Sequence, residues 1–271
     1  MAEKLSQIAE IGYRDPRLSP DGQFMAISSD DARNGKYFIR VYDLARGVST
    51  RLTESGNYES SAWSRDGRRS VYDASDDKSH HLSVVPADGS SPPQILLKGT
   101  AILRHPDWSP DGHLVFTDFS ERFPFVKVYS VVDRQVVPFA RGGEGDSRQM
   151  ASGLPTPVQA IGPPVPPMFS SSPSGPGGHL KISGKDGAQP VWARDGKQIF
   201  HITSDRKMMA VSFDPQHKAV GAPRMLFQTR IIAPNFFSTQ DDVSADGRFL
   251  INSVPANYSS PLTLLTGWTA P

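Results

Sequence analysis

Short apolar stretches recur along the chain, and polar turns rich in Gly, Asp and Pro separate them. The stretches are only a few residues long and contain β-branched and aromatic residues, which is typical of β-strands. They recur in groups of two or three. The first strand of each group is predicted at 24–27, 71–72, 114–116, 199–202 and 249–251. The second is predicted at 38–42, 82–85, 125–129, 208–213 and 262–265, and the third at 50–52, 94–97, 135–139 and 224–227. The pattern predicts an all-β chain.

One phrase precedes every group of strands. It begins with an apolar residue, continues with a small residue, and ends after one further position in Asp-Gly. It occurs at 18–22, 63–67, 108–112, 192–196 and 243–247. Asp-Gly is a strong hairpin signal, because Gly adopts a positive φ at little cost. Each phrase is therefore predicted to turn an innermost strand into the next strand of its group.

The spacing of the phrase predicts the architecture. Successive glycines of the phrase lie 45, 45, 84 and 51 residues apart, and 84 is close to two periods, so one unit has lost its signature. Six units of this length, each with four strands, are typical of a β-propeller. We expect a single domain with antiparallel four-stranded blades at about 12–57, 58–100, 101–142, 143–186 (degenerate), 187–233 and 234–271.

The start of the chain is expected to complete the last blade, which has only three strands of its own. The stretch Lys4 to Ile11 is apolar enough to supply the fourth strand and so close the ring. The alternative is a short amphipathic helix, since Leu5, Ile8 and Ile11 are spaced three residues apart.

The stretch from Glu144 to Gly178 breaks the pattern. It holds eight of the 24 prolines, and proline cannot donate a hydrogen bond within a central sheet ladder. One interpretation is a flexible linker between two half-propellers.

A second interpretation of this stretch is a local frameshift from about 143 to 173, compensated before Gly175. When the codons of Asp146 to Pro157 are read one base earlier, the codon that spans Met150 and Ala151 becomes GGC, glycine. With permitted third bases, the hidden frame spells Phe-Ser-Pro-Asp-Gly and a following strand, at the place where the period requires them. The coding DNA tests this hypothesis.

The phrase resembles the TolB-type, WD-like propeller repeat, whose hallmark is a Trp/Phe-Ser-Pro-Asp-Gly turn between the first two strands of a blade. The segments 172–178, 181–183, 189–196, 207–211 and 262–268 resemble the C-terminal propeller of certain bacterial serine/threonine protein kinases. That resemblance implies a noncatalytic sensing or protein-binding role. The chain lacks a Gly-rich phosphate loop, a His-Arg-Asp motif and an Asp-Phe-Gly motif, so kinase activity is not implied.

Composition narrows the functional classes. The formal net charge is +1 and there is no cysteine, which excludes disulfides, thiolate catalysis and Cys-based metal sites. Charges of both signs are interspersed, so neither nucleic acid nor an anionic membrane is an expected partner. We find no export signal and no membrane span, and therefore expect a cytoplasmic monomer that binds a protein or peptide. An extracytoplasmic location is expected instead if the chain is a fragment of a membrane-bound kinase.

Catalytic patterns are missing from the sequence. The seven histidines lack metal-ligand spacing, and the His-Glu-x-x-His, Ca²⁺-loop and Gly-x-Ser-x-Gly motifs do not occur. The Ser-x-Asp-Gly turns look similar to the Asp box of sialidases, but they lack the residue that this box has between Asp and Gly. We therefore interpret them as structural turns. Their aspartates are predicted to bind their own turn, and Trp63, Trp108 and Trp192 are predicted to lie in the core between blades. We expect neither catalysis nor a cofactor.

One polar position recurs four residues before the small residue of each phrase, on the predicted innermost strand. It is occupied by Asp15, Ser60, His105, Gln189 and Gln240. These residues are expected to ring one mouth of the central channel and to be candidate ligand-binding residues. The alternative interpretation is that these residues are polar only because the mouth of any propeller channel is exposed to solvent. Joint substitution of His105 and Gln189 is expected to abolish binding with little change in Tm. The alternative function is that of a truncated regulatory propeller, which belongs to a kinase or to a prolyl-oligopeptidase-like hydrolase.

Overall fold

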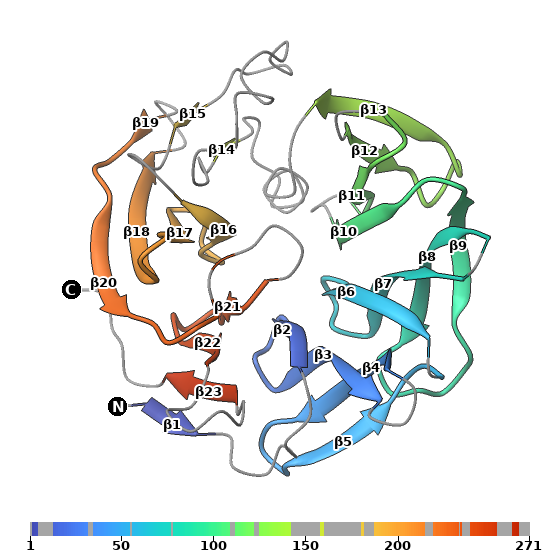
Figure 1. Ribbon diagram of the computed structural model, residues 1–271, viewed down its shortest axis with the longest axis horizontal. Helices are drawn as coiled ribbons and strands as arrows, with labels where there is room; N and C mark the ends of the chain where they lie inside the picture. Colours follow the sequence, from blue (N-terminus) through green and yellow to red (C-terminus); the bar gives the residue numbers. More distant parts are fainter. Residues whose placement is uncertain are drawn as a thin grey trace.

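The protein is all-β in the parts of the chain that the computed structural model describes. These are residues 2–4, 13–31, 35–54, 56–76, 78–108, 112–121, 125–141, 158–159, 180–181, 187–214, 219–232, 234, 239–253 and 262–265. They contain strands and turns but no helix. Figure 1 shows the sheets arranged around a common axis, as in a propeller. The prediction of an all-β fold with a propeller-like arrangement of sheets is confirmed.

The first three sheets are antiparallel, four-stranded, and formed from consecutive strands. The first holds β2 (Tyr13–Leu18), β3 (Phe24–Asp31), β4 (Lys36–Asp43) and β5 (Val48–Arg51). The second holds β6 (Asn57–Trp63), β7 (Arg69–Ser75), β8 (His80–Pro86) and β9 (Gln94–Gly99). The third holds β10 (Leu103–Trp108), β11 (Leu114–Asp118), β12 (Phe125–Tyr129) and β13 (Val136–Arg141). The predicted strands of this part of the chain all occur.

The sheet after the proline-rich stretch has one strand more than we expect. It contains β16 (Ala188–Trp192), β17 (Gln198–Ile202), β18 (Lys207–Asp214), β19 (Ala219–Val220) and β20 (Arg224–Gln228). The two strands β19 and β20 pair with different parts of the long strand β18. The extra strand therefore extends the blade at one end of β18.

The last sheet combines both ends of the described chain. Its order is β1 (Ala2–Lys4), β23 (Leu262–Leu265), β22 (Phe249–Asn252) and β21 (Asp241–Val243). The strands β1 and β23 are antiparallel, with Glu3 opposite Leu264, and Figure 1 shows them side by side. The pairing strand thus begins earlier than the expected stretch 4–11. Residues 5–12, where the helical alternative was placed, lie outside the described residues.

The proline-rich stretch is described at only two short places. These are β14 (Val158–Gln159) and β15 (Leu180–Lys181), which pair in parallel. The other residues between 142 and 186 lie outside the described residues, and with them most of the expected degenerate blade and of the hypothesised frameshift.

The hydrophobic core lies between neighbouring sheets. Trp63 packs with Ile39 and Val85 between the first and second sheets, and Trp108 packs with Leu82 and Phe116 between the second and third. On the other side of the axis, the rings of Phe200 and Phe249 meet edge to face at 4.8 Å. Such aromatic side chains dominate burial energetics. The predicted role of Trp63 and Trp108 as core between blades is confirmed.

The Ser-x-Asp-Gly phrase forms a closed hydrogen-bonded turn. In the first sheet, Ser19 Oγ donates to Asp21 Oδ1 (2.6 Å) and accepts from the backbone N of Phe24 (2.9 Å), while Asp21 Oδ1 accepts from the N of Gln23. Gly22 has φ +70°, which an L-residue rarely adopts. The serine hydroxyl lowers the pKa of Asp21, and the same arrangement recurs at Asp66 and Asp246. These aspartates are turn formers, as predicted.

Candidate functional site

The five candidate residues lie at the axis end of the five sheets. Asp15, Ser60, His105 and Gln189 are on β2, β6, β10 and β16, and Gln240 directly precedes β21. Figure 1 shows that these strands are the innermost ones. All five residues are buried, with Gln189 the most exposed at 7%. They therefore lie on or directly before the innermost strands, while their place at a channel mouth and their role in ligand binding stay predictions.

Three of the five share an unusual backbone conformation. Asp15, His105 and Gln189 have φ values of 51°, 51° and 54°, and a proline follows each of them in the sequence. A β-bulge interrupts the pairing of the innermost strand at each of these positions. Proline keeps the preceding residue out of the right-handed helical region, and positive φ in a residue other than glycine costs energy. Strain of this kind is concentrated at functional sites.

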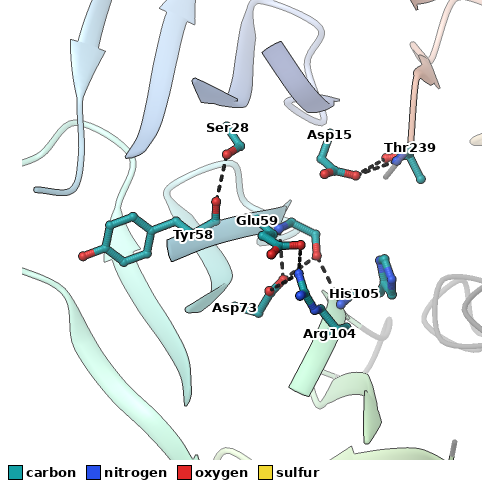
Figure 2. A network of polar contacts seen from close by, with 9 residues as sticks. Asp15, Ser28, Tyr58, Glu59, Asp73, Arg104, His105 and Thr239 are labelled. Carbon is teal, nitrogen blue, oxygen red and sulfur yellow. Dashed lines mark hydrogen bonds and ion pairs between the residues drawn. The ribbon is translucent and has the colours of Figure 1, made fainter. Parts of the chain in front are cut away.

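The candidate side chains link neighbouring sheets. Ser60 Oγ accepts a hydrogen bond from the backbone N of His105 (3.2 Å), and Gln189 Oε1 accepts one from the N of Gln240 (3.2 Å). Asp15 Oδ1 accepts two hydrogen bonds from Thr239, from its backbone N (2.6 Å) and its hydroxyl (2.9 Å). Figure 2 shows the contacts of Asp15 and His105. The position therefore joins sheets as well as facing the axis.

A cluster of charged side chains lies beside Ser60. The Ser60 hydroxyl and backbone N both donate to Asp73 Oδ1, and Arg104 forms an ion pair with Glu59 and lies 3.7 Å from Asp73 Oδ2 (Figure 2). Burial raises the pKa of Asp73 to about 6, although Ser60 and His105 oppose that shift. Removal of the carboxylate from water disfavours its charged form.

Two aspartates that the sequence reasoning missed are buried next to Gln240. Asp242 Oδ2 accepts a hydrogen bond from the backbone N of Leu18 (2.8 Å), whereas neither carboxylate oxygen of Asp241 has a hydrogen-bond partner among the described residues. Burial and the neighbouring Asp242 raise the pKa of Asp241 to about 8, and Arg17 opposes this. In the sequence they could have been found as two consecutive aspartates directly before the apolar strand residue Val243.

The axis of the propeller is lined by polar groups of several kinds. Within the described ranges, no group of three or more His, Asp or Glu side chains is arranged to hold a metal ion. The searched part of the chain also contains no helix that is long and apolar enough to span a membrane. What the axis offers is a set of buried carboxylates, amides and hydroxyls on rigid strands.

Comparison with known proteins supports the type of repeat. No family model matches the chain. A TolB homolog of Chlorobium chlorochromatii (strain CaD3) is 37% identical over 97 residues, which are 36% of this chain and 21% of that protein. The chain therefore matches about a fifth of the length of this curated relative.

A solved structure of similar fold agrees with this architecture. A puromycin hydrolase variant (S511A) complexed with PGG has a TM-score of 0.51 and 14% identity, over 91% of this chain and 43% of that one. TolB from Acinetobacter baumannii has a TM-score of 0.47 and 15% identity, over 94% of this chain and 54% of that one. The repeated phrase, the sheets around one axis and the similarity to the TolB homolog together support a TolB-type β-propeller repeat.

Proposed function

We propose that this chain is a noncatalytic binding module that takes up a protein segment or peptide at the axis of the propeller. Asp15, Ser60, His105, Gln189 and Gln240 are the residues proposed to form the binding site. The module needs no cofactor, binds neither nucleic acid nor membrane, and acts as a monomer. Fold similarity alone cannot name a ligand, so the proposal depends on the site itself.

The observation that carries the proposal is the convergence of polar groups on strained backbone. Three innermost strands place a non-glycine residue at φ near +50°, immediately before proline, at the same position relative to the repeated phrase. A purely structural position has no need for this repeated strain, because an ordinary extended residue could continue each strand. Polar groups that converge in one place are typical of ligand sites.

The proposal includes a complete ring of six blades. The sheet order, the pairing of β1 with β23 and the place of β14 and β15 between β13 and β16 support it. In this arrangement residues 143–186 form the degenerate fourth blade, and the first residues of the chain complete the sixth.

The test is selection of random heptapeptides displayed on phage against the immobilised protein. Joint substitution of His105 and Gln189 is no longer the cleanest probe, because the Gln189 side chain accepts a hydrogen bond from a neighbouring sheet. His105→Asn is preferred, since Asn tolerates positive φ better than most residues. Peptides selected on the wild-type protein should bind His105→Asn at least about tenfold more weakly.

The matched control is His80→Asn on β8, which removes an imidazole at a distance from the axis. It should bind the selected peptides like the wild-type protein, and circular dichroism should show that both variants are folded. Failure to enrich any peptide, or equal loss of binding in both variants, contradicts the proposal.

A second candidate keeps the same module but attaches it to an enzyme. Segments such as 189–196 and 207–211 resemble the C-terminal propeller of bacterial serine/threonine kinases, and a prolyl-oligopeptidase-like hydrolase is the other candidate enzyme. Sequencing the gene with its flanking DNA distinguishes the two proposals. A kinase or hydrolase coding region in frame beside this one favours the second.

A further inference from the structure

Four aspartates lie on the innermost strands around the axis of the propeller. Asp15 on β2 and Asp241 and Asp242 on β21 are all buried, and Asp107 on β10 is partly buried. Arg17 is the buried cation that interacts with this group, and its Nε donates to the backbone oxygen of Ser61 (3.2 Å). Among these described side chains, carboxylates outnumber the buried guanidinium.

Three of these aspartates have a hydrogen-bond donor from the protein. Asp15 accepts from Thr239, Asp242 accepts from Leu18, and Asp107 Oδ1 accepts from the backbone N of Trp108 (2.8 Å). Asp241 differs: it is only 1% exposed, and neither of its oxygens has a partner in the described part of the chain. A buried carboxylate without donors is costly, so this one lacks a group that would satisfy it.

Strand alternation determines the direction of the Asp241 side chain. Asp241 and Val243 lie on the same face of β21, because side chains alternate along a strand. Val243 packs into the cluster that contains Val191 and Phe200, so Asp241 faces the sheet of β16, while Asp242 faces β2. Asp241 thus lies at the axis end of the junction between the sheets of β16 and β21.

We infer that the binding site at the axis holds its ligand through a cationic group, a protonated amine or a guanidinium, that pairs with the carboxylate of Asp241. This inference deepens the proposed function and rests on it. Ammonium and guanidinium groups supply several N–H donors, and their positive charge would favour the ionised form of Asp241. A divalent metal ion fits less well, because the described residues hold no group of three or more His, Asp or Glu side chains arranged as metal ligands.

The experiment uses the heptapeptides selected by phage display on the wild-type protein. We expect Lys or Arg to be enriched at one position of these peptides. A synthetic peptide from the selection is then compared with its citrulline counterpart, which replaces the guanidinium by a neutral urea of similar shape. By fluorescence anisotropy, citrulline should weaken binding to the wild-type protein by about tenfold or more, as expected for loss of a buried charge pair.

The protein variant Asp241→Asn is compared with the wild-type protein for both peptides, which gives a double-mutant cycle. It should bind the two peptides with affinities equal within about twofold, because the charge partner is gone. The control is Asp246→Asn in the exposed turn after β21, which should keep the full preference for arginine.

The outcomes separate this inference from the proposed function. Selected peptides without Lys or Arg, or a citrulline peptide that binds the wild-type protein as well as the arginine peptide, overturn the cationic ligand and leave the peptide-binding module standing. Such a result means that water or a neutral donor satisfies Asp241. Failure to select any peptide overturns both. Because the citrulline comparison uses the wild-type protein, it does not depend on the folding of a variant.

Discussion

The indole Nε1 of Trp63 donates a hydrogen bond of 2.9 Å to the backbone carbonyl oxygen of Arg17, on the innermost strand of the neighbouring sheet. Trp192 occupies the same position of its own phrase, but its Nε1 is buried and has no partner among the described residues. The repeat thus provides two equivalent tryptophans that differ in one hydrogen bond.

We expect Trp63→Phe to destabilise the protein more than Trp192→Phe. Trp63→Phe removes this hydrogen bond between the sheets, which should cost about 0.5–1.5 kcal/mol beyond the loss of packing. Trp192→Phe removes an indole N–H that is already unsatisfied. Chemical denaturation of both variants measures the difference, and equal losses would show that the hydrogen bond between the sheets contributes nothing.

The turn of the fourth phrase, at 192–196, offers a stabilising substitution. Ala193 takes the place of the serine in this phrase, although its backbone makes the same hydrogen bonds as Ser64, from Ala193 N to Gln198 O and from Gly196 N to Ala193 O. Ala193→Ser should add hydrogen bonds to Asp195 and to the backbone N of Gln198, and raise stability by about 0.5–1.5 kcal/mol. Ser64→Ala should cause a comparable loss in its own turn. An unchanged Tm in both variants contradicts this account of the phrase.

The hairpin turns were predictable because their causes are local. Asp21 and Gly22 carry the chemistry of their turn within a few residues, so the sequence alone indicates it. The pairing of β1 with β23 follows from the need to cover a sheet edge, which predicts that a strand is supplied but not which residues form it. For this reason the sequence did not indicate that the strand covers 2–4 and not the expected stretch 4–11.

The candidate site could be predicted only in part. The repeat identifies the position of Asp15 and His105, but their positive φ depends on a bulge, and the following prolines were the signal for it. The buried and unpartnered state of Asp241 depends on the packing of the sheet of β16 against β21. That contact joins residues about fifty positions apart, and no local pattern encodes it.

Stability is expected to fall as the pH rises, because of Asp241. Its pKa in the folded protein is about 8, above the ordinary value of 3.8, since burial disfavours the charged form. A raised pKa means that the contribution to stability is complete below about pH 4 and is lost progressively until the pH passes about 8. Asp241→Asn should remove this dependence and raise Tm most above pH 8.

Thermal melts between pH 5 and pH 9 measure the effect. Asp246→Asn serves as the control, because the hydrogen bond from Ser244 lowers the pKa of Asp246, whose titration therefore lies below this range. A wild-type Tm that stays constant over the range, or that falls equally in Asp241→Asn, would contradict the buried state of this carboxyl.

The register of β1 against β23 can be tested by an engineered disulfide. Glu3 lies directly opposite Leu264, and the chain has no cysteine of its own, so Glu3→Cys with Leu264→Cys introduces a single pair. Directly opposite residues of an antiparallel pair have Cβ atoms about 4.5–5.5 Å apart, close to the range that a disulfide requires. Oxidation should close a loop of nearly the whole chain and raise stability by up to about 5 kcal/mol.

The control for this disulfide is Glu3→Cys with Thr263→Cys. Thr263 lies opposite Lys4, so the two cysteines are one residue out of register and point to opposite faces of the sheet. Non-reducing electrophoresis should show the faster-migrating cyclic form only for the pair of positions 3 and 264. Efficient oxidation of the control, or a disulfide at 3 and 264 that leaves the denaturation midpoint unchanged, would mean that the first strand does not hold this sheet edge in solution.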